Sequence, residues 1–212
     1  MKTDDFINVL SADAPSQERS PHRAMAIAVA AGALIAGALL MLTLRPRPDF
    51  ASAMMTLRFD FKFVVTLLLA AGAFFVLRDM ARPEIQRSPF RPLLLAAPAL
   101  LLLAVVLEMI AVPRDLWMPR LIGHNMRFCT TFIPLFSLGP LALMLWALRS
   151  GAPAHPARAG AIAGLLAGGI GAAFYAAHCF DDSPLFVAVW YTLAIGFVAG
   201  LGAVLGSRLL RW

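Results

Sequence analysis

The sequence predicts an all-α membrane protein, a bundle of six transmembrane helices with both termini in the cytoplasm. Hydrophobic residues make up 60% of the 212 residues and charged residues only 14%, against about 45–50% and about 25% in soluble domains. Six apolar runs approach the roughly 20 residues that cross a bilayer. The segments between these runs hold nearly all the charges. These observations exclude a soluble globular protein and a disordered one.

The first apolar run, Ala24–Leu44, is predicted to be an uncleaved span rather than a signal peptide. The tail before it is rich in acidic residues, and the sequence RPRP follows it in place of a small-residue cleavage site. Five further runs follow. We therefore expect a tail, 1–23, and a membrane domain, 24–212, with spans at about 24–44, 61–77, 93–112, 128–148, 159–180 and 185–206.

The distribution of basic residues predicts the orientation. A net charge of +6 is compatible with nucleic-acid binding, but in a membrane chain Lys and Arg flank the spans and their richer side faces the cytoplasm. The tail, the loops 78–92 and 149–158 and the C-terminus together hold 11 of the 18 Lys and Arg residues. We expect these segments to be cytoplasmic, and we expect no direct contact with nucleic acid.

Small residues predict how the last two spans pack. Glycines four residues apart let membrane helices approach closely, and the loop between these spans, Asp181–Pro184, is very short. We predict a tight helical hairpin in which the glycines serve packing. The glycines concerned are Gly160, Gly164, Gly168, Gly196, Gly200, Gly202 and Gly206.

The tail is predicted to carry a short amphipathic helix. Thr3 can cap it, and the acidic side chains of its first turn suit the positive end of a helix. Three apolar residues then share one face. Such a short helix is marginal alone in water, so we expect it to lie in a groove of a partner protein. A position on the membrane surface is the alternative, although such helices are usually basic. The contact residues would be Asp4, Asp5, Phe6, Ile7 and Leu10.

Two cysteines are predicted to lie at the same membrane depth. Cys129 begins the fourth span and Cys179 ends the fifth, so both face outward in the predicted topology. A disulfide between them is feasible if the two spans are neighbours, and an oxidising outer compartment permits one. Thiolate and imidazole also bind soft metal ions, although this spacing matches no metal motif. Inert buried cysteines are the third reading. The candidate metal-binding set is Cys129, Cys179, His178, Asp181 and His124.

The sequence contains no motif of a known catalytic site. We find no G-x-S-x-G, P-loop or H-E-x-x-H pattern. A transporter or channel subunit, for instance for metal ions, would place charges inside the membrane, and Glu108 is the candidate. A membrane redox enzyme would use the two thiols. We do not expect an enzyme, and we expect no resident cofactor.

Several motifs together resemble one known family. These are the opening MKTDDFINVLSADA, the six spans, Cys129 at the head of the fourth span and the block YAAHCFDDSPLFVAVWY over Tyr175–Tyr191. They are similar to the NrsF family, which consists of integral-membrane negative regulators, or anti-sigma factors, of bacterial extracytoplasmic-function sigma factors. The resemblance covers nearly the whole chain.

The resemblance implies a regulator in the bacterial inner membrane. The protein would hold an extracytoplasmic-function sigma factor at its cytoplasmic face, through the acidic tail, and release it on a signal from outside. In this family the two outer cysteines are regarded as the element that responds to heavy-metal or oxidant stress. By position these are Cys129 and Cys179, with His178 beside them. A heavy-metal ion bound transiently at this pair is the one cofactor that the resemblance implies.

Overall fold

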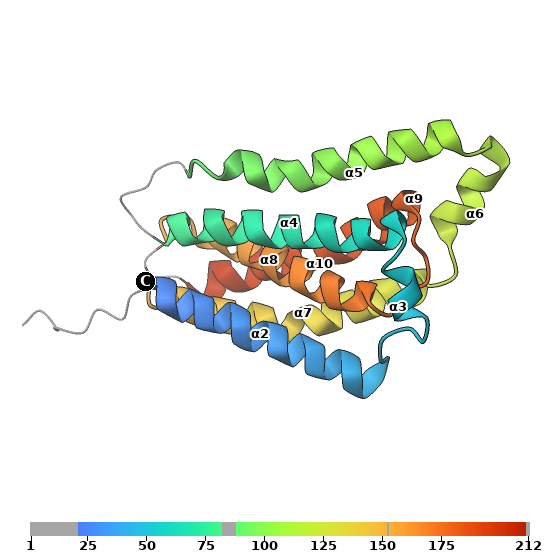
Figure 1. Cartoon of the computed structure of the whole chain (residues 1–212). Coiled ribbons are helices and arrows are strands. Elements are labelled where there is room, and N and C mark those ends of the chain that lie inside the picture. Colours follow the sequence, from blue (N-terminus) through green and yellow to red (C-terminus); the bar gives the residue numbers. More distant parts are fainter. Residues whose placement is uncertain (1–20, 82–87, 152, 211–212) are drawn as a thin grey trace, which may run out of the picture.

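The computed structural model describes residues 21–81, 88–151 and 153–210, and all the regular structure in these ranges is helical (Figure 1). Six helices there are long and apolar enough to span a membrane, which confirms the predicted all-α class and the number of long apolar helices. They are α2 (Pro21–Thr43), α4 (Leu57–Met80), α5 (Arg91–Ala111), α7 (Met126–Leu148), α8 (Pro156–Ala176) and the rod Pro184–Leu209, in which α9 (Pro184–Phe186) and a π-helix (Val187–Tyr191) lead into α10 (Thr192–Leu209).

The helices run alternately in opposite directions, so the bundle has two distinct ends (Figure 1). We call one the cysteine end; it carries the segments 44–56, 112–125 and 177–183. We call the other the tail end; there α2, α5 and α8 begin, and α4, α7 and α10 end. At the tail end the Arg149 side chain donates a hydrogen bond to the carbonyl of Leu209, at 3.5 Å. Both ends of the described chain therefore lie at the tail end.

Helix α8 forms the centre of the bundle. In its most apolar window 78% of the residues are buried, and it packs against α4, α7 and α10. Its glycines make the contact with α10 close, as predicted, because a Cβ at Gly160 would overlap the carbonyl oxygen of Gly202. Gly196 and Gly200 of α10 face open space instead, with no atom within 4 Å of an added Cβ. Only part of the predicted glycine pattern therefore serves packing between helices.

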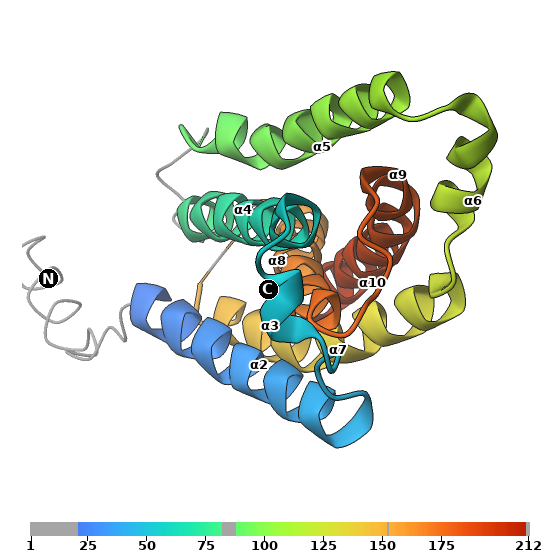
Figure 2. The ribbon, with the colours of Figure 1, turned by 45° about the vertical axis from the view of Figure 1, so that its right-hand side comes forward.

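Helix α5 lies at the edge of the bundle (Figure 2). Only 11% of its apolar window is buried. It packs against α4 where a Cβ at Gly72 would come within 3.0 Å of the Leu94 backbone. Farther along, a cavity of about 340 Å³ lies between α4, α5, α8 and the rod that contains α10, lined by apolar side chains such as Leu101 and Ile195. Helix α5 is therefore held mainly by the contacts near its two ends.

The segments at the cysteine end contain short helices that hydropathy did not predict. These are α3 (Phe50–Ala53), a 3₁₀ turn (Arg114–Leu116) and α6 (Trp117–Ile122). Helix α8 ends at Ala176, four residues before the end expected at Phe180. Beyond that point the chain bonds to other segments, and the carbonyl of Ala177 accepts a hydrogen bond from the Arg47 backbone at 3.0 Å. The predicted tail helix lies outside the described residues.

Candidate functional site at the cysteine end

The structure brings the two predicted cysteines to the same end of the bundle. Cys129 lies in the first turn of α7, and Cys179 lies three residues beyond the end of α8. Both side chains are fully buried, and both thiols are free. They belong to one apolar cluster, together with Tyr175 and Tyr191. The two cysteines, predicted to lie at the same membrane depth, therefore lie at the same end of the bundle.

Asp181 joins the segment after α8 to the start of α7. Its carboxylate accepts hydrogen bonds from the backbone N–H of His124 (3.0 Å), the backbone N–H of Asn125 (2.8 Å) and the Asn125 side chain (3.0 Å). An anionic group is favoured at a helix N-terminus, where N–H groups lack partners. The Cys129 N–H bonds back to the Asn125 carbonyl at 2.8 Å, and the Cys179 thiol faces the Asp181 carbonyl at 3.8 Å. Asp181 thus holds both cysteine segments together.

A fully buried lysine underlies the Cys179 segment. Lys62 of α4 has an exposed fraction of 0%. Its ammonium donates to the Cys179 carbonyl at 2.8 Å and pairs with Asp182 at 2.5 Å, and it lies 5.0 Å from the centre of the Phe59 ring. A charge in the apolar interior persists only when it is paired and hydrogen-bonded. Lys62 therefore fixes the position of the Cys179 segment against α4.

Arg47 holds the same segment from the other side. Its guanidinium pairs with Asp182 at 3.1 Å and with Asp49 at 2.6 Å, and it lies over the Phe180 ring at 4.5 Å. The Arg47 pair holds the pKa of the exposed Asp49 carboxyl below its usual value. Asp182 is thus shared between two cations from separate parts of the chain.

Glu108 holds α5 in place at the cysteine end of the bundle. Its buried carboxylate accepts hydrogen bonds from Arg120 (2.9 Å), the Ser183 hydroxyl (2.7 Å) and the Leu185 N–H (3.2 Å), with Arg58 at 3.7 Å. The residue that sequence analysis offered as a transport charge therefore forms a buried anchor. It joins α5 to α6 and to the start of α9.

Burial keeps the Cys179 thiol protonated. Removal from water raises the pKa of this thiol, and the Lys62 ammonium acts in the opposite direction without reversing the effect. Because the thiolate is the reactive form, the buried thiol reacts slowly. An open cavity of about 300 Å³ reaches Asp181 and Phe180, but neither cysteine lines it. Reagents from water therefore meet the Cys179 segment before they meet its sulfur.

The five predicted metal-binding residues do not form a ready-made site. Among the described residues, no three His, Cys, Asp or Glu side chains are grouped so that they could hold a metal ion. The His124 side chain is 97% exposed, and the His178 ring bonds to the Arg45 carbonyl at 2.9 Å. Asp181 is engaged by the start of α7. Metal binding at this end stays a prediction, and it would require a rearrangement.

Sequence reasoning missed the cations of this site. The sequence places Lys62 and Arg47 among the charges that flank the spans, because spacing along one chain does not show which carboxylate a side chain meets. The signal that could have found Lys62 is its place inside the helical run Leu57–Met80, since a charge in a span usually has a partner. The predicted sigma-factor contacts, Asp4, Asp5, Phe6, Ile7 and Leu10, lie outside the described residues.

The fold and the site define a multi-pass helical membrane protein with two buried cysteines at one end, beside the ion pairs that Lys62 and Arg47 form with Asp182. Comparison with known proteins is more specific. The family described as NrsF, negative regulator of sigma F, matches residues 10–212, and the chain therefore belongs to the NrsF family. This family is named for regulation and not for a catalysed reaction.

Two curated relatives match over their full length. The anti-sigma-F factor NrsF of Caulobacter vibrioides (strain NA1000 / CB15N) is 34% identical over 216 residues, covering 100% of both chains. The probable anti-sigma-F factor NrsF of Azospira oryzae is 34% identical over 215 residues, also covering 100% of both chains. No solved structure matches this chain.

Proposed function

We propose that this protein is an anti-sigma factor of the bacterial inner membrane that holds a sigma factor of the extracytoplasmic-function class at its cytoplasmic face. The match to the NrsF family over residues 10–212 carries this proposal. The full-length relatives named anti-sigma-F factors support it, because a piece shared with an unrelated protein would not cover 100% of both chains. In this proposal the tail end faces the cytoplasm.

The acidic tail makes the main contact with the sigma factor. Asp4 and Asp5 supply charge, and Phe6, Ile7 and Leu10 supply an apolar face that a groove can bury. The described residues of loops 78–92 and 149–158 lie at the tail end, and in this proposal these loops add to the contact. In this proposal the partner is a protein, so the membrane protein itself needs no nucleic-acid site.

The signal acts at Cys129 and Cys179, with His178 adjacent, in the outer part of the bundle. Their burial in one cluster supports this role, because any change at either sulfur disturbs packed helices rather than free loops. An oxidant would take two electrons and two protons from the thiols to form a disulfide. A heavy-metal ion would displace the thiol protons and bind the sulfurs. Either event weakens the hold on the sigma factor at the opposite end.

The transporter alternative loses its principal residue in this structure. It depended on Glu108 as a charge beside a water-filled path, and Glu108 is instead bonded to Arg120, Ser183 and Leu185. A membrane redox enzyme would use the same two thiols, but the NrsF family is named for regulation and not for a catalysed reaction. We therefore argue only the regulatory function.

Co-purification tests the proposed function. The tagged full chain, extracted gently from its native bacterium, should bring a sigma factor with it. Deletion of residues 1–14 should abolish this association while the membrane domain stays folded. Exchange of Asp4 and Asp5 for Asn is a milder variant that should weaken it. A wild-type chain that purifies without any sigma factor would refute the proposal, and a deletion that retains the partner would move the contact to the loops.

A further inference from the structure

Helix α4 carries one buried ionisable residue near each of its ends. Lys62 lies at the cysteine end with an exposed fraction of 0%, and Asp79 lies at the tail end with 4%. At 1.5 Å per residue the two positions are about 25 Å apart along the helix. Ionisable residues within membrane helices are energetically expensive and usually functional. Neither residue belongs to the thiol pair or to the tail.

At the cysteine end, Lys62 depends on the segment that carries Cys179. Its ammonium meets the Cys179 carbonyl and the Asp182 carboxylate, and both partners lie in the 177–183 segment. If that segment moves, Lys62 either follows or remains as an unpaired charge in the apolar interior. Leaving such a charge unpaired is strongly unfavourable. Movement of the Cys179 segment is therefore coupled to movement of α4.

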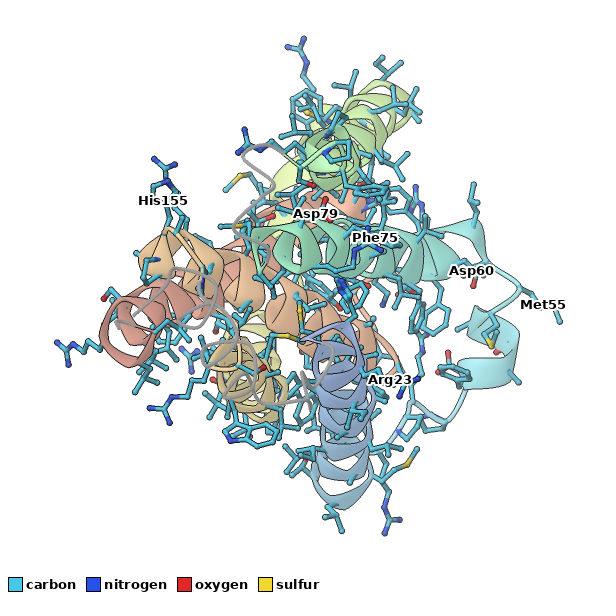
Figure 3. All side chains as sticks on the ribbon, turned by 90° about the vertical axis from the view of Figure 1, so that its left-hand side faces the viewer. Arg23, Met55, Asp60, Phe75, Asp79 and His155 are labelled. Atoms are coloured by element: carbon cyan, nitrogen blue, oxygen red, sulfur yellow. The ribbon has the colours of Figure 1, made fainter. Side chains whose placement is uncertain are left out.

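At the tail end, α4 holds the start of α5 through three contacts. The Ser88 hydroxyl donates to the Asp79 carboxylate at 2.6 Å. Phe75 stacks on Phe90 with ring centres 5.0 Å apart, and the Arg78 guanidinium lies over both rings. Figure 3 views the bundle from the tail end and shows Asp79 and Phe75 together on α4. The position of α4 therefore sets the position of residues 88–90.

The contact between α4 and α8 would allow a small shift. A Cβ at Gly169 of α8 would come within 2.9 Å of the Thr66 carbonyl and 3.1 Å of Ala70, so small groups form this contact. Small residues at a helix interface keep backbones close without interlocking side chains. Shifts of about 1–2 Å between packed helices are a known form of switching.

We propose that α4 is the element that couples the cysteine end to the tail end, with Lys62 and Asp79 as its two connecting residues. A thiol event at Cys179 displaces the 177–183 segment, Lys62 moves with Asp182, and Asp79 carries the shift to residues 88–90. This inference rests on the proposed function, because the sigma factor is what the tail end would then release. Lys62 is a positioning residue here, since it acts through the Cys179 segment.

Hydrogen exchange of the purified full chain in lipid nanodiscs tests the coupling without a sigma factor. Lys62→Met should raise exchange of residues 88–94 by about fivefold or more, the lower end of ordinary coupling between sites. Helix α8 should stay protected. Thr66→Val is the matched control, because this buried hydroxyl on the same helix bonds only to the carbonyls of Lys62 and Phe63. It should leave residues 88–94 unchanged.

Asp182→Asn removes the same ion pair by changing the partly exposed carboxylate instead of the buried lysine. This variant tests the coupling if the Lys62→Met protein does not fold. It should give the same distant effect. Faster exchange confined to the cysteine end, an equal rise throughout α8, or no change at residues 88–94 would each overturn the coupling. The proposed function fails separately, if the wild-type chain co-purifies with no sigma factor.

Discussion

A thiol buried like that of Cys179 reacts only when its covering segment moves or its proton is displaced. Its chemistry is set by two opposed neighbours, the apolar surroundings that favour the neutral form and the Lys62 ammonium that favours the thiolate. Burial dominates, so the raised pKa makes the thiol contribute to folding stability below its ordinary pKa of about 8.5. That contribution is lost as the pH rises from the ordinary pKa through the raised one.

Alkylation of Cys179 should therefore be slow. Its rate should keep rising with pH beyond the range in which an exposed thiol titrates. In a Cys129→Ser protein in detergent, we expect iodoacetamide to react more slowly with Cys179 at pH 7.5 than with an ordinary thiol, because the raised pKa lowers the thiolate fraction. The rate should still increase at a pH where the rate of an exposed thiol has levelled off.

The matched control is Ser52→Cys in a chain without either native cysteine, because Ser52 is exposed at the same end. Mass spectrometry of the intact protein follows both rates. If Cys179 and the control cysteine levelled off at the same pH, the burial of Cys179 would be disproved.

The individual residues also show where sequence reasoning stops. Cys129 and Cys179 could be placed at one end from topology alone, because helix order fixes which span ends face together. The distant partners of Lys62 and Glu108 could not be found in this way. Asp182 lies 120 residues from Lys62, and Ser183 lies 75 residues from Glu108. Such pairs depend on which helices become neighbours, and no local pattern records that.

At the scale of elements, the close contact between α8 and α10 holds the centre of the bundle. Hydropathy predicted the long helices well, since their apolar length is a property of each segment alone. It did not predict α3, α6 or the π-helix Val187–Tyr191, which depend on contacts with other segments. In α6, for instance, the following Gly123 adopts a positive φ of 59°, and the Trp190 side chain bonds to the Leu121 carbonyl at 2.8 Å.

Two glycine substitutions should have opposite consequences. Gly160→Ala places a methyl group against the Gly202 backbone, so we expect it to destabilise the bundle by roughly 1–3 kcal/mol, as overpacking does. Gly200→Ala adds its methyl group in open space and should be neutral or stabilising by up to about 1 kcal/mol, because alanine favours helix. Thermal unfolding in one detergent compares them. Equal midpoints for the two variants would refute the close α8–α10 contact.

At the scale of the whole molecule, charge differs between the two ends. Among the described residues Asp79 is the only acidic one at the tail end, and it is buried. The acidic residues of the cysteine end, by contrast, are numerous and largely paired with cations. The orientation itself stays a prediction from the Lys and Arg count over the whole sequence. The exposed arginines of the tail end are Arg23, Arg91, Arg149, Arg158 and Arg208.

Single cysteines in a chain without Cys129 and Cys179 should report this orientation. Asp115 is exposed at the cysteine end and Ser150 at the tail end. A membrane-impermeant maleimide added to intact spheroplasts should label Asp115→Cys. It should label Ser150→Cys only after the membrane is permeabilised. The reverse pattern would place the tail in the outer compartment, away from any sigma factor.

Control of sigma-factor release by the cysteine pair can be tested with a sigma-dependent reporter in the native bacterium. Reporter output would be measured for wild type, Cys129→Ser and Cys179→Ser, with and without a thiol oxidant or a soft heavy-metal ion. We predict low output in all three strains without the stress, and strong induction in wild type alone under it. Induction of both serine variants to the wild-type level would contradict the account.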